Sequence, residues 1–439
     1  MIKFIRTCAS GIALAAACAT MSAQQAMPAT APPAPPLTVA NAEHLSIERN
    51  PRISIARLLQ LAQAQVTREA RSAELPTATG SLTAVDSHAG SRITAGLLNN
   101  PSVYNRAAGG LTVSQLITDF GRTHNLILSA ESRDKAQKDA QLASRDDVIL
   151  AVDQAFYLAL SNQAVVKVAE QTVAARQATS DKIGALAASK LRSSLDLSFA
   201  NVELSQANLL LLDAQDAAQE SMANLNALLG SETDEQHTLV DETPTNAEPP
   251  PDNVEPLVQI AFASRPDLAA LNDSYTASRQ FSAAQHALGR PVISALGAVG
   301  GTPVRSDQII SSWYGAVGAN VNIPIFNGFL FSAQARESDL RASAAQEEVR
   351  NLRALIARDV RTSALTAQAA FHRIDVTRQL RDHSNQALDL AQTRYQLGLS
   401  GVVELIQAQL AQTEGEISYA SARFAYQQAL AALRFQTGQ

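Results

Sequence analysis

The sequence has 439 residues with a formal net charge of −6, 17% charged residues and 5% aromatic residues. Its lysines and arginines alternate with acidic residues instead of forming a cluster, which excludes a basic footprint for nucleic acid. The frequent alanine and glutamine are typical of helices rather than of a varied globular core, so the chain is expected to be mainly α-helical.

The chain begins with the features of an export signal. Lys3 and Arg6 provide a basic start, and residues 11–19 form a short apolar run that ends in small residues. We therefore predict a signal peptide over residues 1–23 and a mature protein outside the cytoplasm. Both cysteines lie in this leader, so the rest of the chain is expected to have no disulfide and no cysteine metal site.

Two fates are open to Cys18. Residues 14–18 resemble a lipoprotein box, in which the cysteine becomes the lipidated N-terminus, although the aliphatic residue lies one place too early. Ordinary cleavage after Ala19 or Ala23 would instead remove Cys18 with the leader. Either outcome is compatible with the proline-rich stretch that follows, for which we predict an extended tether over residues 24–50.

The mature chain is predicted to consist of two tandem structural repeats. A second proline-rich stretch lies near its middle, and we assign a linker to residues 231–255, between repeats over residues 51–230 and 256–439. The repeats align Asp196 with Glu404 and Gly230 with Gly438 at a spacing of 208 (404 − 196 and 438 − 230), and Gly121 with Gly328 at 207 (328 − 121). This difference predicts a slip of one residue at the strand-to-helix junctions.

Each repeat is expected to contain an amphipathic helix, two strands, a very long helix and a returning helix. In the first repeat we predict a helix over about 53–75, strands over about 77–86 and 107–118, and a long helix over about 122–189; in the second, a helix over about 256–288, strands over about 291–300 and 314–326, and a long helix over about 329–397. A proline-free helix of about seventy residues would extend roughly 105 Å.

The returning helix of the first repeat carries a heptad pattern. Leucines and alanines recur every seven residues, with small residues between them: Leu197, Leu204, Leu211, Ala218 and Leu225, then Ala200, Ala207, Ala214, Ser221 and Leu228. Such a pattern predicts antiparallel coiled-coil packing, and the small seam residues allow helices to approach closely. This geometry suits the wall of a tube better than a thick bundle.

The strands alternate between apolar residues and small or polar residues, most clearly over residues 314–326. A soluble, half-buried sheet gives the same alternation, but strands of about ten residues with one apolar face also suit an outer-membrane barrel. Trp313, Tyr314 and Tyr104 lie at the outer ends of the strands, where they suit an interfacial aromatic belt.

The same segments bear on how the chain meets a membrane. No segment after the leader approaches ~20 continuous apolar residues, so no membrane-spanning helix is expected. Four strands cannot close a barrel, and lipid does not tolerate an open sheet edge. If the strands span a membrane, the protein must therefore oligomerise.

Together these features resemble the TolC-like outer-membrane factors over essentially the whole mature chain. The resemblance rests on the duplication and on three stretches, residues 265–268, 322–328 and 394–405. It implies a homotrimer with a twelve-stranded barrel in the outer membrane of a Gram-negative bacterium and a long α-helical tunnel in the periplasm. It also implies contact with outer-membrane lipid, a periplasmic adaptor and an inner-membrane pump, and no cofactor.

The resemblance assigns an entrance at the helix-to-helix turns. Glu404 matches a position whose carboxylate lines the narrow opening, and a ring of three such groups would favour cations. Asp196, Arg394 and Tyr395 resemble the polar network that holds the entrance shut. Solvated tip residues without a gating role would give the same pattern.

Two further groups of residues follow from the resemblance. Adaptor contact is expected at the turns, through Lys190, Leu191, Arg192 and Ser193 in the first repeat and Leu397, Gly398, Leu399 and Ser400 in the second. Lys190 stands where the second repeat has a glycine. Gly121, Pro324 and Gly328 are expected to bend the chain where strands become helices, because proline lacks an N–H and glycine tolerates unusual backbone angles.

The sequence offers no catalytic motif. Asp119-Phe120-Gly121 lies at a predicted strand-to-helix junction without the other kinase motifs, and His372 and His383 lack partners with metal-ligand spacing. The chain is therefore not expected to be an enzyme. We expect an efflux channel in a tripartite system; the alternatives are the channel of a type I protein secretion system and a periplasmic coiled-coil scaffold or adaptor.

Overall fold

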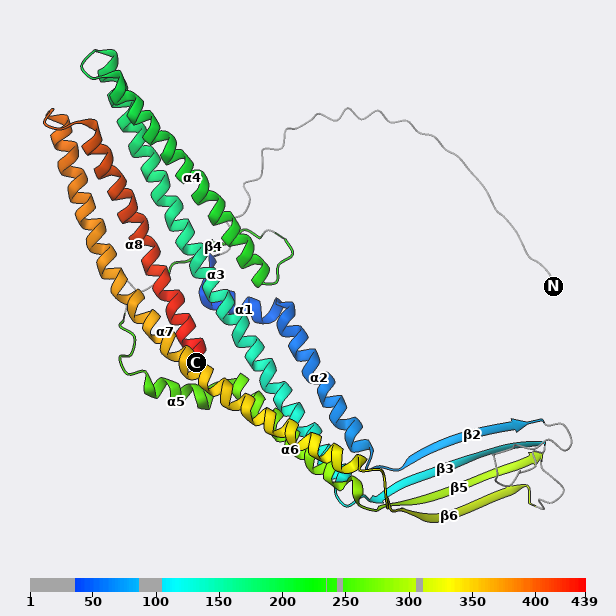
Figure 1. The fold of residues 1–439 in the computed structure, drawn as a ribbon. Helices are drawn as coiled ribbons and strands as arrows, with labels where there is room; N and C mark the ends of the chain where they lie inside the picture. The colour runs from blue at the N-terminus through cyan, green and yellow to red at the C-terminus, as the bar shows by residue number, and fades with distance from the viewer. Residues whose placement is uncertain (1–35, 87–104, 234, 243–247, 305–310) are drawn as a thin grey trace, which may run out of the picture.

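The computed structural model describes residues 36–86, 105–233, 235–242, 248–304 and 311–439. Long helices fill one end of the molecule, and a four-stranded sheet projects from the other (Figure 1). This arrangement confirms the prediction of a mainly helical chain with a small sheet. The predicted signal peptide, Cys18 and Tyr104 lie outside the described residues.

The first half of the described chain follows the expected order of elements after two unexpected elements at its start. It contains β1 (Pro36–Leu37), α1 (Val39–Arg49), α2 (Pro51–Ser72), β2 (Thr77–Val85), β3 (Arg106–Thr118), α3 (Arg122–Ala188) and α4 (Ser194–Leu228). The second half contains β4 (Thr238–Leu239), α5 (Glu255–Ser264), α6 (Pro266–His286), a 3₁₀ turn (Ala287–Gly289), β5 (Val292–Val304), β6 (Trp313–Asn322), α7 (Leu330–Gln396) and α8 (Val402–Thr437).

The predicted tether over residues 24–50 is wrong in its second part, because residues 39–49 form α1. Thr38 caps this helix by accepting a hydrogen bond from the backbone N–H of Asn41 at 3.2 Å. Ala42 and Ser46 are fully buried where α1 packs against α3. Burial of this small face fixes a segment whose composition alone suggested an extended chain.

The predicted helix over residues 256–288 is two helices, α5 and α6. Pro266 begins α6, and the preceding Arg265 has an extended backbone with ψ of 120°. Proline has no N–H to continue a helix and disfavours helical geometry in the residue before it. The prolyl bond therefore forces a break that the apolar pattern conceals.

The two long helices, α3 and α7, are the same length and confirm a constant spacing between the halves. Each has 67 residues, and their first and last residues lie 208 positions apart (330 − 122 and 396 − 188). The predicted slip of one residue at the junctions is wrong. At each junction two successive residues are left-handed: Phe120 and Gly121 with φ of 54° and 96°, and Gly328 and Phe329 with φ of 63° and 67°. Backbone shape, rather than the place of the glycine, sets the register.

The sheet is antiparallel, with strand order β2-β3-β5-β6. Residues that pair directly across the strands lie on the same face of the sheet. Leu111, Val299 and Gly315 pair in this way and belong to an apolar face. Tyr314 pairs with Gly300 and lies on the opposite face, where its ring covers Gly300 and Gly110. The two residues of the predicted aromatic belt therefore lie on different faces of the sheet: Trp313 lies on the apolar face and Tyr314 on the opposite one.

The long helices form a layer in which α4 packs on α3, α3 on α8, and α8 on α7. Side chains connect the middle pair: Gln409 donates to the Thr179 hydroxyl at 3.3 Å, and Gln428 donates to the Gln154 carbonyl at 3.2 Å. The outermost helices are therefore α4 and α7. The outermost strands are β2 and β6.

One helix in the described chain, α3, is long and apolar enough by composition to cross a membrane. An 18-residue stretch has a mean hydropathy of 1.2. Along its length, however, α3 packs against α2, α4, α6 and α8. This packing accounts for part of its apolar character, since 39% of that stretch is buried.

A buried carboxyl group lies where α1 meets α3. Burial, together with the nearby Glu43 on α1, raises the pKa of Asp153 on α3 to about 7, while Arg434 on α8 opposes the shift. Protonation of Asp153 therefore stabilises the docking of α1. Because the pKa in the folded state exceeds the ordinary value of 3.8, this contribution is lost as the pH rises toward about 7.

We expect the docking of α1 to weaken between pH 4 and pH 8 and Asp153→Asn to remove most of that dependence. Asparagine keeps the shape of the side chain and stays neutral at every pH in this range. Limited proteolysis after α1, followed across the pH series, measures the docking. A pH dependence that is equal in the wild type and in Asp153→Asn would contradict this assignment.

Candidate functional site

The candidate site lies at the two helix-to-helix turns, at the end of the helices away from the sheet (Figure 1). Both turns have the same backbone. Lys190 and Gly398 are left-handed with φ of 59° and 72°. In each turn the next N–H bonds back across the helix end: Leu191 to the Leu186 carbonyl at 2.9 Å and Leu399 to the Arg394 carbonyl at 2.8 Å.

Lys190 therefore adopts a backbone geometry that favours glycine, and this lowers the stability of the turn. A non-glycine residue in the left-handed region is destabilised by about 1 kcal/mol. We expect Lys190→Gly to stabilise the turn by roughly this amount and Gly398→Ala to destabilise its counterpart by a similar amount. Thermal unfolding of both variants measures the effects; equal melting temperatures for wild type, Lys190→Gly and Gly398→Ala would be incompatible with this account.

Tyr395 is the centre of the site, because it holds the two helical hairpins together. It is 5% exposed and packs in an apolar cluster drawn from α3, α4, α7 and α8: Ile183, Ala200, Val402 and Leu405. Its hydroxyl is buried without a hydrogen-bond partner among the described residues. Burial raises the pKa of the Tyr395 hydroxyl.

Arg192 contacts Tyr395 twice, an interaction that the sequence did not predict. Its Nη2 donates to the Tyr395 carbonyl at 2.9 Å, and its guanidinium lies 4.3 Å from the centre of the Tyr395 ring. We predicted Arg192 as an adaptor contact, but the structure places it across the gap between the two hairpins. The residues are 203 positions apart, so no local spacing could indicate the pair.

Arg394 and Glu404 form an ion pair between α7 and α8. Arg394 Nε lies 2.8 Å from Glu404 Oε1, and both side chains are about half exposed. Glu404 is therefore partly neutralised within its own chain. Asp196 lies close enough to Tyr395 to raise the pKa of its hydroxyl, but it forms no ion pair with Arg394 in the part of the chain that the structure describes.

The predicted adaptor-contact residues differ in exposure. Three leucines project from the turns: Leu191 at 71%, Leu397 at 67% and Leu399 at 66% exposed. Ser193 caps α4 by accepting a hydrogen bond from the Leu195 N–H at 3.1 Å, and Ser400 is half-buried. These exposed leucines give the tip an apolar surface.

The junction residues have unequal roles. Gly121 and Gly328 adopt the left-handed geometry described above, whereas Pro324 lies two residues beyond the end of β6. Arg290 donates to the Phe120 carbonyl at 2.6 Å and ties the first junction to the start of β5. Pro324 therefore ends the strand pairing, and the later left-handed pair makes the turn.

The described residues contain no group of three or more histidine, cysteine, aspartate or glutamate side chains that could hold a metal ion. The site instead combines one ion pair, one cation–aromatic contact and a small apolar cluster. Such an arrangement can hold two helical hairpins together and release them at modest cost.

The sequence matches the family model described as outer membrane efflux protein over residues 44–231 and 257–439. Similar solved structures include the outer membrane protein VceC of Vibrio cholerae, with a TM-score of 0.81 and 18% identity over 91% of this chain and 96% of that chain. The Campylobacter jejuni CmeC outer membrane channel has a TM-score of 0.80 and 15% identity over 91% and 85%. No curated protein matches the sequence.

Proposed function

Since the chain belongs to the outer membrane efflux protein family, and is thus an outer-membrane channel protein rather than an enzyme, we propose that three copies form the exit duct of a tripartite efflux system. A periplasmic adaptor and an inner-membrane pump would deliver the substrate, and the duct would conduct it passively to the exterior.

One observation carries this proposal. In the described chain, the sheet at one end and the helical layer at the other each have two outer sides without a neighbouring element. Its four-stranded sheet leaves the outer sides of β2 and β6 unpaired. Its helical layer likewise ends at α4 and α7. Open strand edges are not tolerated in lipid, and three copies would supply twelve strands to close the barrel.

The proposed entrance is formed by the turn residues. Tyr395 and Arg192 would hold the hairpins together, and the Arg394–Glu404 pair would secure the opening. The exposed leucines of the turns, with Lys190 and Gly398, would contact the adaptor. The surface here is apolar, so a partner with an apolar helical tip fits it.

The remaining boundaries are also proposals. Residues 1–23 would act as the signal peptide, and residues 51–230 and 256–439 would act as the two structural repeats. The family model leaves residues 232–256 unmatched between its two segments, which supports a division there. If cleavage instead left Cys18 as the N-terminus, its lipidation would add an anchor to the inner leaflet.

The proposal is tested in outer-membrane fractions and planar bilayers. We expect trimers that resist dissociation by detergent until heated, and channels that conduct ions. A soluble monomer without conductance would overturn the proposal. Deletion of the gene should sensitise cells to small toxic compounds. If the deletion instead abolished only the secretion of a polypeptide, the protein would be the channel of a protein secretion system.

A further inference from the structure

The outer face of α4 carries a second heptad pattern that packs on nothing in the described chain. Ten residues spaced by seven are all exposed: Leu195, Val202, Leu209, Asp216 and Ala223, then Phe199, Gln206, Asp213, Glu220 and Ala227. The pattern is apolar near the turn and acidic further along. The helix contains no lysine or arginine. Its outer face therefore suits a partner helix that is apolar at one end and cationic at the other.

The acidic part of α4 borders a hollow of about 880 Å³. Asp216, Gln219, Glu220 and Ala223 form one wall, and the loop that follows α4 forms the other through Glu232 and Glu235. Within the described chain, Asp216, Glu220 and Glu232 form no ion pair, so their charges are uncompensated.

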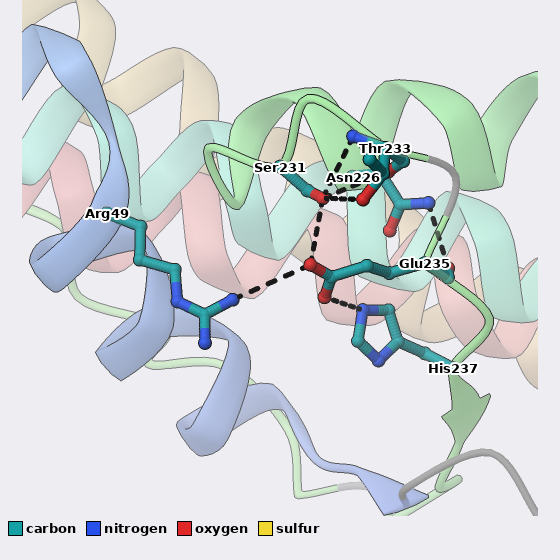
Figure 2. A network of polar contacts seen from close by, with 6 residues as sticks. All are labelled: Arg49, Asn226, Ser231, Thr233, Glu235 and His237. Atoms are coloured by element: carbon teal, nitrogen blue, oxygen red, sulfur yellow. Dashed lines mark hydrogen bonds and ion pairs between the residues drawn. The ribbon is translucent and has the colours of Figure 1, made fainter. Parts of the chain in front are cut away.

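The loop wall of the hollow is fixed in place (Figure 2). Glu235 accepts a hydrogen bond from the Ser231 hydroxyl at 3.0 Å and lies 3.8 Å from Arg49 on α1 and 3.5 Å from His237. These contacts use the Glu235 carboxylate and leave the other acids facing the opening. The hollow is thus built before any partner arrives.

The outer face of α7 is the complement. Its exposed heptad residues are Leu365, His372, Gln379, Gln386 and Thr393, then Ala369, Val376, His383, Leu390 and Leu397. The apolar residues nearest the turn are Leu390 and Leu397, and the histidines lie further along. Beside His372, Arg373 is exposed and forms no ion pair with any described residue.

The two faces also agree in height. Glu220 lies 26 residues from the start of α4, about 39 Å, and His372 lies 24 residues from the end of α7, about 36 Å. Both distances start from turns that meet at Tyr395. An antiparallel pairing therefore sets the leucines near the two turns opposite one another and Glu220 opposite His372.

We propose that α4 of one protomer docks antiparallel onto α7 of a second copy, with His372 and Arg373 entering the acidic hollow around Glu220. This inference rests on the proposed assembly and adds its register and its charge pairing. The apolar section near the turn would hold the subunits together, and the polar section would fix which residues meet.

Cross-linking tests the register in the full chain assembled in membranes. With Glu220→Cys and His372→Cys in the same chain, a short bismaleimide should give dimer and trimer bands. Glu220→Cys with Leu390→Cys is the matched control: Leu390 lies on the same face but about 27 Å along the helix, so the bands should be absent. Bands of equal strength in the two pairs would overturn the register.

A second pair separates this inference from the proposed assembly. Leu195→Cys with Leu397→Cys should cross-link near the turns. If this pair gives bands and the Glu220/His372 pair does not, the assembly stands and the proposed register falls. If neither pair gives bands, the assembly itself is wrong.

Charge exchange tests the chemistry of the hollow. Glu220→Arg should lower the temperature at which detergent-treated trimers dissociate by a few degrees, and adding His372→Glu should restore most of the loss. A double variant no more stable than Glu220→Arg alone would overturn the charge pairing, since a purely steric contact gains nothing from the exchange.

Discussion

Tyr395→Ala is expected to separate the two helical hairpins at their turns and to hold the channel entrance open. The ring is almost fully buried in a cluster drawn from four helices, and it also supports the Arg192 guanidinium. Removing a buried aromatic side chain typically costs about 3–5 kcal/mol. We expect a marked loss of thermal stability at the tip and a large rise in conductance in planar bilayers.

Tyr395→Phe is the matched control. The hydroxyl is buried without a partner in the described chain, so its removal sacrifices no hydrogen bond and relieves the cost of burying a polar group. We expect the phenylalanine variant to be as stable as the wild type or more stable, with unchanged conductance. If Tyr395→Phe opened the channel as Tyr395→Ala does, the hydroxyl rather than the ring would be responsible, and this account of the site would be wrong.

Glu404→Ala is expected to raise single-channel conductance and to lower the preference for cations. The substitution removes one carboxylate per subunit and leaves Arg394 unpaired at the opening. An exposed ion pair contributes at most about 1 kcal/mol, which corresponds to about a fivefold change in the ratio of closed to open entrances. Conductance and reversal potential in planar bilayers measure both effects.

Arg394→Ala provides the opposing test for the same pair. It should also raise conductance, but it leaves Glu404 uncompensated and should strengthen the preference for cations. Glu414→Ala, an exposed substitution further along α8, should change neither quantity. The gating role of the pair is refuted if Glu404→Ala and Arg394→Ala shift ion selectivity in the same direction.

The proposed adaptor-contact surface and the proposed gate share a short segment but use different side chains. The leucines of the turns point outward, whereas Arg192 and Tyr395 connect the hairpins. A partner that engages the leucines would therefore pull on the same turns that the Arg192–Tyr395 contact holds together. In the proposed assembly, this proximity would give a direct physical route from adaptor binding to opening.

The sequence alone determined the secondary structure well, because local periodicity governs it. Heptad spacing indicated the returning helix α4, and the absence of proline indicated the long helices; α3 and α7 begin and end within one residue of the predicted positions. Alternation located the four strands to within a few residues. The break at Pro266 and the helix α1 were not predicted, because a proline break and a small buried face hardly change the pattern of apolar residues.

The tertiary structure decided the remainder. Three features depend on contacts between residues far apart in the sequence: the choice of the outermost helices, the face of the sheet that carries Tyr314, and the stacking of Arg192 on Tyr395. Arg394 and Glu404 could be chosen from the sequence, but only folding shows that the two charges neutralise each other. Local patterns fix the conformation of a segment, whereas the meeting of segments depends on packing across the whole chain.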